Sequence, residues 1–152
     1  MFVSQITHNL SHFYYLGIWN ELCDIDFTHP KISSKNGKVT YSPDAHYLEN
    51  ESCWTIGNGF FQIETSLFPT SNKRYFLTIT HADPALKWDD SKVQIKVNGE
   101  TVATLTPPKD SYGMELVEIT EYLRAGKNTL RLDAVDIQRY QIQKITLIED
   151  IP

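Results

Sequence analysis

The sequence predicts an all-β protein, built as an antiparallel β-sandwich or barrel. Apolar residues occupy alternate positions in seven successive runs, which are residues 60–68, 74–82, 92–100, 101–107, 114–122, 128–136 and 140–149. Clusters of Pro, Gly, Asn or Asp separate these runs, and an Asn-Gly dipeptide stands between two of them. A period of two marks strands that bury one face, and seven such strands at this spacing are typical of a sandwich or barrel.

The strand signal is clearest in residues 92–97, where Val93, Ile95 and Val97 alternate with polar residues. The Asn98-Gly99 dipeptide that follows suits a type I′ turn, which needs positive φ at both central residues, so the flanking strands should be adjacent and antiparallel. A second hairpin is predicted at Asn36-Gly37. In residues 140–149 the alternation slips by one step, as it does at a β-bulge.

Residues 119–132, "ITEYLRAGKNTLRL", combine a short helical turn, a glycine and an alternating strand. We expect Thr120 to cap a single turn near residues 120–124, and Tyr122 and Leu123 to point inward. Gly126 should adopt the left-handed conformation that ends the turn. Asn128 follows at the turn-to-strand junction, where its side chain can bond nearby backbone groups, and this favours a structural role.

The first 55 residues are harder to place. Ile6, Leu10, Phe13 and Leu16 have roughly helical spacing and precede Gly17, whereas the aromatic residues around them suit a strand equally well. The chain contains no linker, repeat or low-complexity segment, so we expect one domain over residues 1–152.

Composition excludes several classes of protein. The formal net charge of −5 argues against nucleic-acid binding, which relies on Lys and Arg. No apolar run is long enough to span a membrane, and the N-terminus lacks a signal peptide. A cytoplasmic protein is therefore expected, or an extracellular one if a leader was removed or export is non-classical. Cys23 and Cys53 fit buried thiols better than a disulfide or a metal site.

The order of these elements resembles the galactose-binding-domain-like jelly roll, found in sugar-binding domains of family 2 glycoside hydrolases and in many carbohydrate-binding modules. The matching segments are "VQIKVNGETVATL", residues 93–105, and "VEITEYLRAGKNTLRL", residues 117–132. Glu118 takes the place where the family usually has Asp. The resemblance covers about residues 60–149, and it implies the fold more strongly than any ligand.

Because successive antiparallel strands alternate direction, loops two strands apart lie at the same end of a sandwich. Residues 69–73, the 98–99 hairpin and the turn 120–127 should share one end, here called the plugged end. Residues 54–60, 82–91, 107–113 and 136–140 should share the other, here called the loop end. The loop end carries the longer and chemically richer loops, where function commonly sits.

The loop end therefore holds the predicted ligand site. Trp88 and Tyr112 could stack on a sugar, while Asp83, Asp89 and Arg139, with Asp90 and Asn58, could bond its hydroxyls. Trp54, in the approach to Phe60, is a further candidate for ligand binding. Each residue alone is more easily explained as loop packing or a solvated charge, so the hypothesis rests on the cluster.

Metal and catalytic motifs are weak or missing. Asp83, Asp89 and Asp90 are weak candidates for a structural calcium, because they lack the spacing and central glycine of a calcium loop. The five histidines are scattered, and only His81, at a strand end beside the loop end, merits mutagenesis. Carboxylates for glycoside hydrolysis could meet in space, but no motif singles out a pair.

We therefore expect a non-catalytic, lectin-like module that binds a carbohydrate or other polyhydroxylated ligand at the loop end, with no cofactor except an optional calcium. The alternative is an interaction or accessory module of the same fold, which docks a protein partner or forms a homo-oligomer. A small glycan-active hydrolase or lyase is the third reading. The carbohydrate part comes mainly from the resemblance, and a fold does not by itself fix a function.

Overall fold

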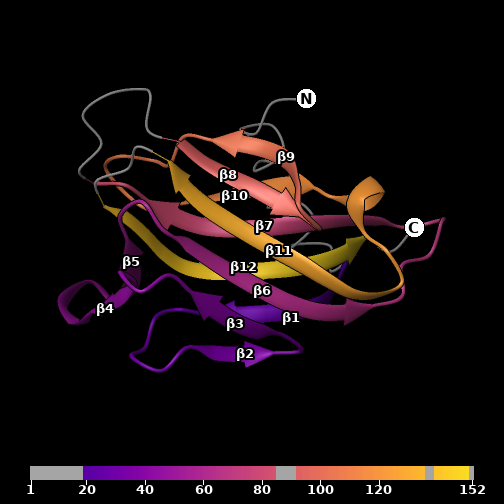
Figure 1. Ribbon diagram of the computed structural model, residues 1–152, viewed down its shortest axis with the longest axis horizontal. Helices are drawn as coiled ribbons and strands as arrows, with labels where there is room; N and C mark the ends of the chain where they lie inside the picture. The colour runs from indigo at the N-terminus through magenta and orange to yellow at the C-terminus, as the bar shows by residue number, and fades with distance from the viewer. Residues whose placement is uncertain (1–18, 85–91, 136–138, 151–152) are drawn as a thin grey trace.

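The computed structural model describes residues 19–84, 92–135 and 139–150, which form two antiparallel sheets packed as a sandwich (Figure 1). The strands are β1 (Trp19–Asp26), β2 (Ser33–Lys35), β3 (Lys38–Tyr41), β4 (His46–Leu48), β5 (Cys53–Ile56), β6 (Phe60–Leu67), β7 (Arg74–Ala82), β8 (Lys92–Val97), β9 (Glu100–Leu105), β10 (Gly113–Glu118), β11 (Gly126–Val135) and β12 (Tyr140–Asp150). Two short 3₁₀ turns, η1 (Glu49–Glu51) and η2 (Thr120–Tyr122), complete the described elements.

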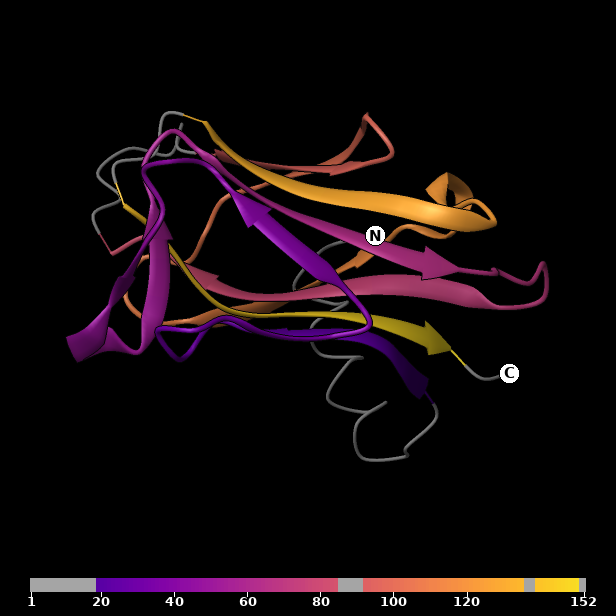
Figure 2. The same cartoon turned by 60° about the horizontal axis from the view of Figure 1, so that its bottom comes forward.

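The larger sheet, here sheet A, has the order β10-β7-β12-β1-β2, with β5 added to β12 and β4 to β5. The smaller sheet, sheet B, has the order β3-β6-β11-β8-β9. Figure 2 shows the two sheets as separate layers, with β11 and β6 in one and β7, β12 and β1 in the other. The inner faces of the two sheets therefore pack against each other.

Alternation along the strands builds the core between the sheets. In β6 and β11 every second residue is buried, and the same holds for β8. Phe61 and Ile63 of β6 and Leu130 and Leu132 of β11 are fully buried in one cluster with Leu77 of β7, across the sandwich. Burying such side chains is worth about 1.5–3 kcal/mol each.

All seven predicted strands from residue 60 onward are confirmed, as β6 to β12. The Asn98-Gly99 hairpin is confirmed too: β8 and β9 pair antiparallel, and φ is 51° at Asn98 and 87° at Gly99. The out-of-phase step in β12 is an irregularity in its pairing with β7, between Ile142 and Lys144.

The predicted Asn36-Gly37 hairpin is wrong. Asn36 does turn the chain, with φ of 61°, but β2 pairs with β1 in sheet A whereas β3 pairs with β6 in sheet B. The turn therefore carries the chain from one sheet to the other. Asn36 forms hydrogen bonds with strands of both sheets. Its side-chain Nδ2 donates to Leu22 O of β1 (3.2 Å), and its backbone carbonyl accepts from Thr65 Oγ1 of β6 (2.6 Å). An Asn-Gly pair fixes the turn geometry but not the partner of each arm.

The turn at the plugged end has the predicted conformation and packing, but Thr120 has a different role from the one predicted. Gly126 has φ of 94°, and Tyr122 and Leu123 pack against the core, as predicted. Thr120 does not cap η2; its Oγ1 instead accepts a hydrogen bond of 2.9 Å from Tyr75 N in β7. The turn is thus hydrogen-bonded to β7 of sheet A.

Cys23 and Cys53 are both free and buried, as expected. Burial raises the pKa of both thiols, that of Cys23 to about 11. Within the described ranges no helix is long and apolar enough to cross a membrane. The short helix considered for residues 6–16 lies outside the described residues.

Candidate functional site

At the loop end, Tyr112 and Arg139 are linked through two further side chains that sequence reasoning did not select. Tyr112 Oη donates to Gln141 Oε1 (2.9 Å), Gln141 Nε2 donates to Glu51, and Arg139 Nη2 lies 2.9 Å from Glu51 Oε1. Burial, together with a hydrogen bond to Cys53, raises the pKa of Tyr112 well above its usual range. Tyr112 is therefore a neutral phenol that is already engaged with its neighbours.

Trp54 belongs to the core and is only 8% exposed. Its Nε1 donates to His29 O (3.0 Å), and its ring centroid lies 4.9 Å from that of Tyr41 and 6.5 Å from that of Tyr47. The structure therefore does not bring Trp54 together with Tyr112 as a surface platform, because β5 directs the indole toward β3 and β4. Asn58 is exposed nearby, in the loop before β6.

Asp83 is completely buried at the end of β7. Its backbone N donates to Pro108 O (2.8 Å), so the loops at residues 83 and 108 meet at the loop end as predicted. Trp88, Asp89 and Asp90, the other members of the predicted cluster, lie outside the described residues. In the part of the chain that the structure describes, no three His, Cys, Asp or Glu side chains gather as metal ligands would.

His81 is fully buried and sits in a chain of polar side chains between the sheets. Its Nδ1 lies 2.6 Å from Tyr140 Oη, and its Nε2 bonds Glu115. The three residues come from β7, β12 and β10, so these side-chain contacts link neighbouring strands of sheet A. Since Tyr140 is also fully buried, its pKa is raised well above the usual range. This arrangement indicates packing rather than contact with a ligand.

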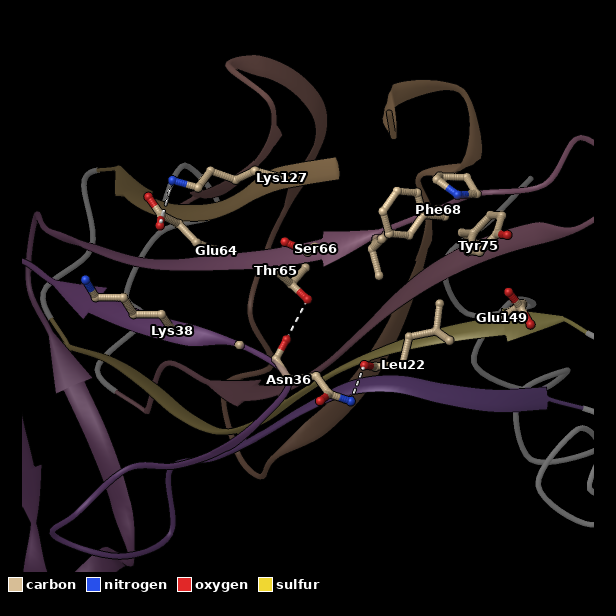
Figure 3. Close-up of a pocket in the computed structure, with 13 residues that line it drawn as sticks. Leu22, Asn36, Lys38, Glu64, Thr65, Ser66, Phe68, Tyr75, Lys127 and Glu149 are labelled. Carbon is tan, nitrogen blue, oxygen red and sulfur yellow. Dashed lines mark hydrogen bonds and ion pairs between the residues drawn. The ribbon is translucent and has the colours of Figure 1, made fainter. Parts of the chain in front are cut away.

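One hollow among the described residues lies toward the plugged end and not at the loop end. It is a groove of about 580 Å³ at the edge of the sandwich, and residues of both sheets line it. Leu22 of β1, Leu67 of β6 and Tyr75 of β7 form its apolar part, and the turn at Asn36 and Gly37 closes one side (Figure 3). Below, this hollow is called the edge groove.

Phe68 projects at the edge groove with 79% of its surface exposed, the most exposed large hydrophobic residue described. It follows the inward-facing Leu67 and precedes Pro69, so β6 ends here and cannot continue into the sheet. Because Tyr75 Oη accepts a hydrogen bond from Thr70 N (2.9 Å), the loop that carries Phe68 is tied to β7. An exposed ring on a fastened loop is a preformed stacking surface.

Charged side chains face Phe68 across the edge groove. Lys127 of β11 and Glu64 of β6 form an exposed ion pair of 3.5 Å, and Lys38 of β3 lies beside them (Figure 3). On the Phe68 side, Glu149 pairs with Lys73 at 3.0 Å. Burial raises the pKa of Glu149, but hydrogen bonds from Lys73, Asn20 and Tyr75 outweigh it and hold this carboxyl below its usual range. The groove thus offers one aromatic face and both donors and acceptors.

A second hollow, of about 520 Å³, follows the same edge of the sandwich on the other side of Gly37 and Lys38. Tyr41, 44% exposed, lines it together with the edge of Trp54 and with Lys31. Sequence reasoning missed both Phe68 and Tyr41. The only signal for Phe68 was an aromatic residue just beyond the last alternating position of a strand.

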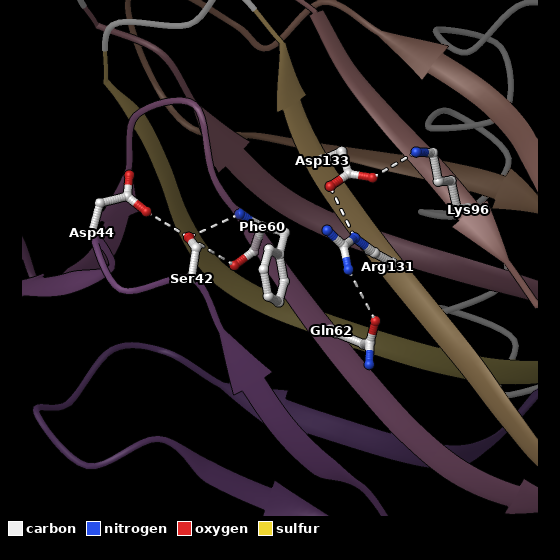
Figure 4. A network of polar contacts seen from close by, with 7 residues as sticks. All are labelled: Ser42, Asp44, Phe60, Gln62, Lys96, Arg131 and Asp133. Atoms are coloured by element: carbon white, nitrogen blue, oxygen red, sulfur yellow. Dashed lines mark hydrogen bonds and ion pairs between the residues drawn. The ribbon is translucent and has the colours of Figure 1, made fainter. Parts of the chain in front are cut away.

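The outer face of sheet B carries a polar network in place of a hollow of this size. Asp133 Oδ1 accepts from Arg131 Nε (2.9 Å) and Asp133 Oδ2 lies 2.9 Å from Lys96 Nζ, while Arg131 stacks over Phe60 at 3.8 Å (Figure 4). Burial raises the pKa of Asp133, but the bonds from Lys96 and Arg131 lower it below its usual range. These groups satisfy one another, so the face resembles a solvated sheet surface.

No family model matches the sequence, and no curated protein matches it with significance. Solved structures do match the fold. A family 36 carbohydrate-binding module of a xylanase from the hindgut metagenome of Trinervitermes trinervoides superposes with a TM-score of 0.54 at 12% identity, over 74% of this chain and 96% of that chain. A family 36 module in complex with calcium and xylotriose gives 0.50 at 11% identity, over 82% and 98%.

The Podospora anserina β-(1,4)-mannanase of glycoside hydrolase family 26, which carries a family 35 carbohydrate-binding module, gives a TM-score of 0.52 at 18% identity. The match covers 85% of this chain but only 28% of the mannanase chain. Sequence identities this low establish the fold alone. The described residues therefore form an antiparallel jelly-roll sandwich, a fold that these carbohydrate-binding modules share.

Proposed function

We propose that this protein is a carbohydrate-binding module without catalytic activity, and that the edge groove is its binding site. The observation that carries the proposal is Phe68, a residue that is 79% exposed beside a groove of about 580 Å³ with charged groups on both sides. An aromatic face packs against the C–H face of a sugar ring, while Lys and Glu side chains bond its hydroxyls. The shared fold with carbohydrate-binding modules supports the ligand class.

The size of the edge groove favours a short oligosaccharide. Small-molecule sites commonly measure about 300–1,000 Å³, and the groove lies within that range. It is open along the edge of the sandwich, so a glycan chain could continue beyond it toward the second hollow at Tyr41. Neutral β-linked oligosaccharides are the first probes to use, since the lysines and glutamates at the groove are largely paired.

The test is chemical-shift mapping by NMR on the full chain, with xylotriose and mannotriose as probes. The proposal expects the largest shifts at Phe68, Ser66 and Lys127. Shifts centred on Tyr112 and Arg139 would place the site at the loop end, as the sequence suggested. No shift with any oligosaccharide of a broad panel would overturn the carbohydrate proposal itself.

Catalysis and calcium are tested separately. We expect no release of reducing sugar on prolonged incubation with the same oligosaccharides, because the proposed role is binding alone. The calcium hypothesis remains with Asp83, Asp89 and Asp90. If a calcium ion stabilises the loop end, adding calcium should raise the melting temperature, and a chelator should reverse the rise without abolishing binding at the edge groove.

A further inference from the structure

A small hollow of about 300 Å³ lies on the outer face of sheet B, beside the polar network of Figure 4. Its lining residues are Gln62 of β6, Lys96 of β8, Thr129 and Arg131 of β11, and Gly99 of the β8–β9 turn. None of these residues lines the edge groove. Two of them are cations, and no carboxylate is among the described residues that line the hollow. Below, it is called the sheet hollow.

The strand register brings three polar side chains into one row across the sheet hollow. In β11, Arg131 is paired with Gln62 of β6 on one side and with Lys96 of β8 on the other. Its neighbours Leu130 and Leu132 are fully buried in the core, so Arg131 points outward. Side chains directly opposite in antiparallel strands lie about 5 Å apart at Cβ, so the three groups can act on one ligand group.

Arg131 is held in place before any ligand arrives. Its guanidinium carbon lies 3.8 Å from the centroid of the Phe60 ring, and its Nε donates to Asp133 Oδ1 over 2.9 Å (Figure 4). Its Nη1 donates to Gln62 Oε1 over 3.4 Å. The side chain is nevertheless 36% exposed, so solvent and solutes reach it. A guanidinium that is already ordered loses little entropy when it binds.

The network has more hydrogen-bond donors than acceptors. Asp133 is engaged by both cations, because its Oδ2 also lies 2.9 Å from Lys96 Nζ. Nη2 of Arg131 makes no hydrogen bond to another described residue, and the ammonium of Lys96 has N–H groups beyond the one that faces Asp133. Glu64, the next outward residue of β6, is already paired with Lys127. Two cations around one carboxylate leave an excess of positive charge and of donors.

We propose that the sheet hollow binds an oxyanion group, such as the carboxylate or sulfate of an acidic glycan. Such a group offers only acceptors, which is what the surplus of donors requires. The planar fork of Arg131 suits two oxygens of one group, while Lys96 adds a point charge and Thr129 a hydroxyl. The site adds a charged group to the ligand class proposed above, and it does not depend on the edge groove.

The experiment is an NMR titration of the full chain with glucuronate, its methyl ester and inorganic sulfate, at constant ionic strength. The ester keeps the sugar and lacks the charge. The proposal expects glucuronate to shift the amide signals of Gly99 and Thr129 and the Nε signal of Arg131, and the ester to leave them unchanged. Shifts of the same size with the ester would overturn it, and so would the absence of shifts with both anions.

The sulfate arm identifies the source of the oxyanion. Tighter binding of glucuronate than of sulfate would support the site and assign a sugar acid as its ligand. Equal or tighter binding of sulfate would support the oxyanion site and assign a free inorganic anion. The xylotriose experiment above reports on the edge groove separately, so a failure of one site is distinguished from a failure of the other.

Three variants test the named donors. Lys96→Gln removes a charge, and Arg131→Lys keeps the charge but loses the planar fork, so each should weaken binding of the anion at least about tenfold. Lys35→Gln, at an exposed position of β2 in sheet A, is the matched control and should change the affinity by less than about twofold. Equal weakening by Lys35→Gln would contradict a local site, because overall charge would then account for the binding.

Discussion

Asn98 and Asn128 are joined directly at the plugged end, where Asn98 Nδ2 donates to Asn128 Oδ1 over 2.9 Å. The same two side chains bond the backbone around them. Asn98 Oδ1 accepts from Thr129 N (2.9 Å), and Asn128 Oδ1 also accepts from Arg124 N (3.0 Å). A hairpin in one part of the sequence is thereby fastened to the turn that precedes β11.

Replacing Asn128 with Ala should lower the free energy of unfolding by about 2–3 kcal/mol, because Asn128 is fully buried and its partners would lose their hydrogen bonds. Thermal denaturation should show a drop of about 5–10 °C. The exposed Asn50→Ala is the matched control and should change stability by less than about 0.5 kcal/mol. Equal melting temperatures for the two variants would refute a structural role for Asn128.

Gly37 and Gly57 differ in the space around them, which gives a paired prediction. A Cβ on Gly37 would lie 2.9 Å from Cys23 Sγ and 3.2 Å from Ile63 Cγ2, whereas one on Gly57 would approach only Asp44 Oδ2, at 3.5 Å. Gly37→Ala should therefore cost about 1–3 kcal/mol by overpacking, and Gly57→Ala should be nearly neutral. Urea denaturation distinguishes them. A neutral Gly37→Ala would mean that the turn does not press against the core.

Stability should fall in alkaline solution through Cys23. Burial, reinforced by Asp24 and opposed by a hydrogen bond to Thr65, raises the pKa of this thiol from 9.0 to about 11. Between these values the unfolded chain loses the proton and the folded chain keeps it. The contribution of Cys23 to the free energy of unfolding is therefore fully present below about pH 9. It is lost as the pH rises toward 11, by about 2–3 kcal/mol in total.

The measurement is urea unfolding at about pH 8 and about pH 11, on the wild type and on Cys23→Ala. The variant will be less stable at both values, but its loss between them should be smaller than that of the wild type. The same pH dependence in both proteins would show that the Cys23 thiol does not titrate as described.

The buried contact between Tyr140 and His81 should matter for stability and not for binding. Tyr140→Phe removes the hydroxyl that lies 2.6 Å from His81 Nδ1, and we expect a loss of about 1–2 kcal/mol. Tyr41→Phe, at a 44% exposed position, is the control and should be neutral. If Tyr140→Phe weakened oligosaccharide binding as well, the buried contact between Tyr140 and His81 would have to influence the ligand site.

Most of the fold was accessible from the sequence because local patterns determine it. Alternation in Val93, Ile95 and Val97 reports which face is buried, and positive φ at Asn98 and Gly99 follows from their residue types. The error at Asn36-Gly37 shows the limit of such patterns. Whether two arms of a turn pair with each other or join different sheets depends on long-range partners, here Leu22 and Thr65.

The candidate site was less accessible. The alternation of strand direction correctly predicted that the loops at residues 83 and 108 meet, and that Tyr112 lies near Arg139. It could not reveal that Trp54 points into the core or that β2 and β3 leave a groove at the sandwich edge. The exposure of Phe68 depends on where β6 ends relative to both sheets, and no local pattern encodes that relation.

The most direct test of carbohydrate binding at the edge groove is calorimetric titration of wild type, Phe68→Ala and Tyr41→Ala with an oligosaccharide that binds the wild type. Loss of an exposed stacking ring should weaken binding at least about tenfold, which corresponds to about 1.4 kcal/mol. We predict that weakening for Phe68→Ala, with stability equal to that of the wild type, and a change of affinity of less than about threefold for Tyr41→Ala. Unchanged affinity in a folded Phe68→Ala protein would contradict the account.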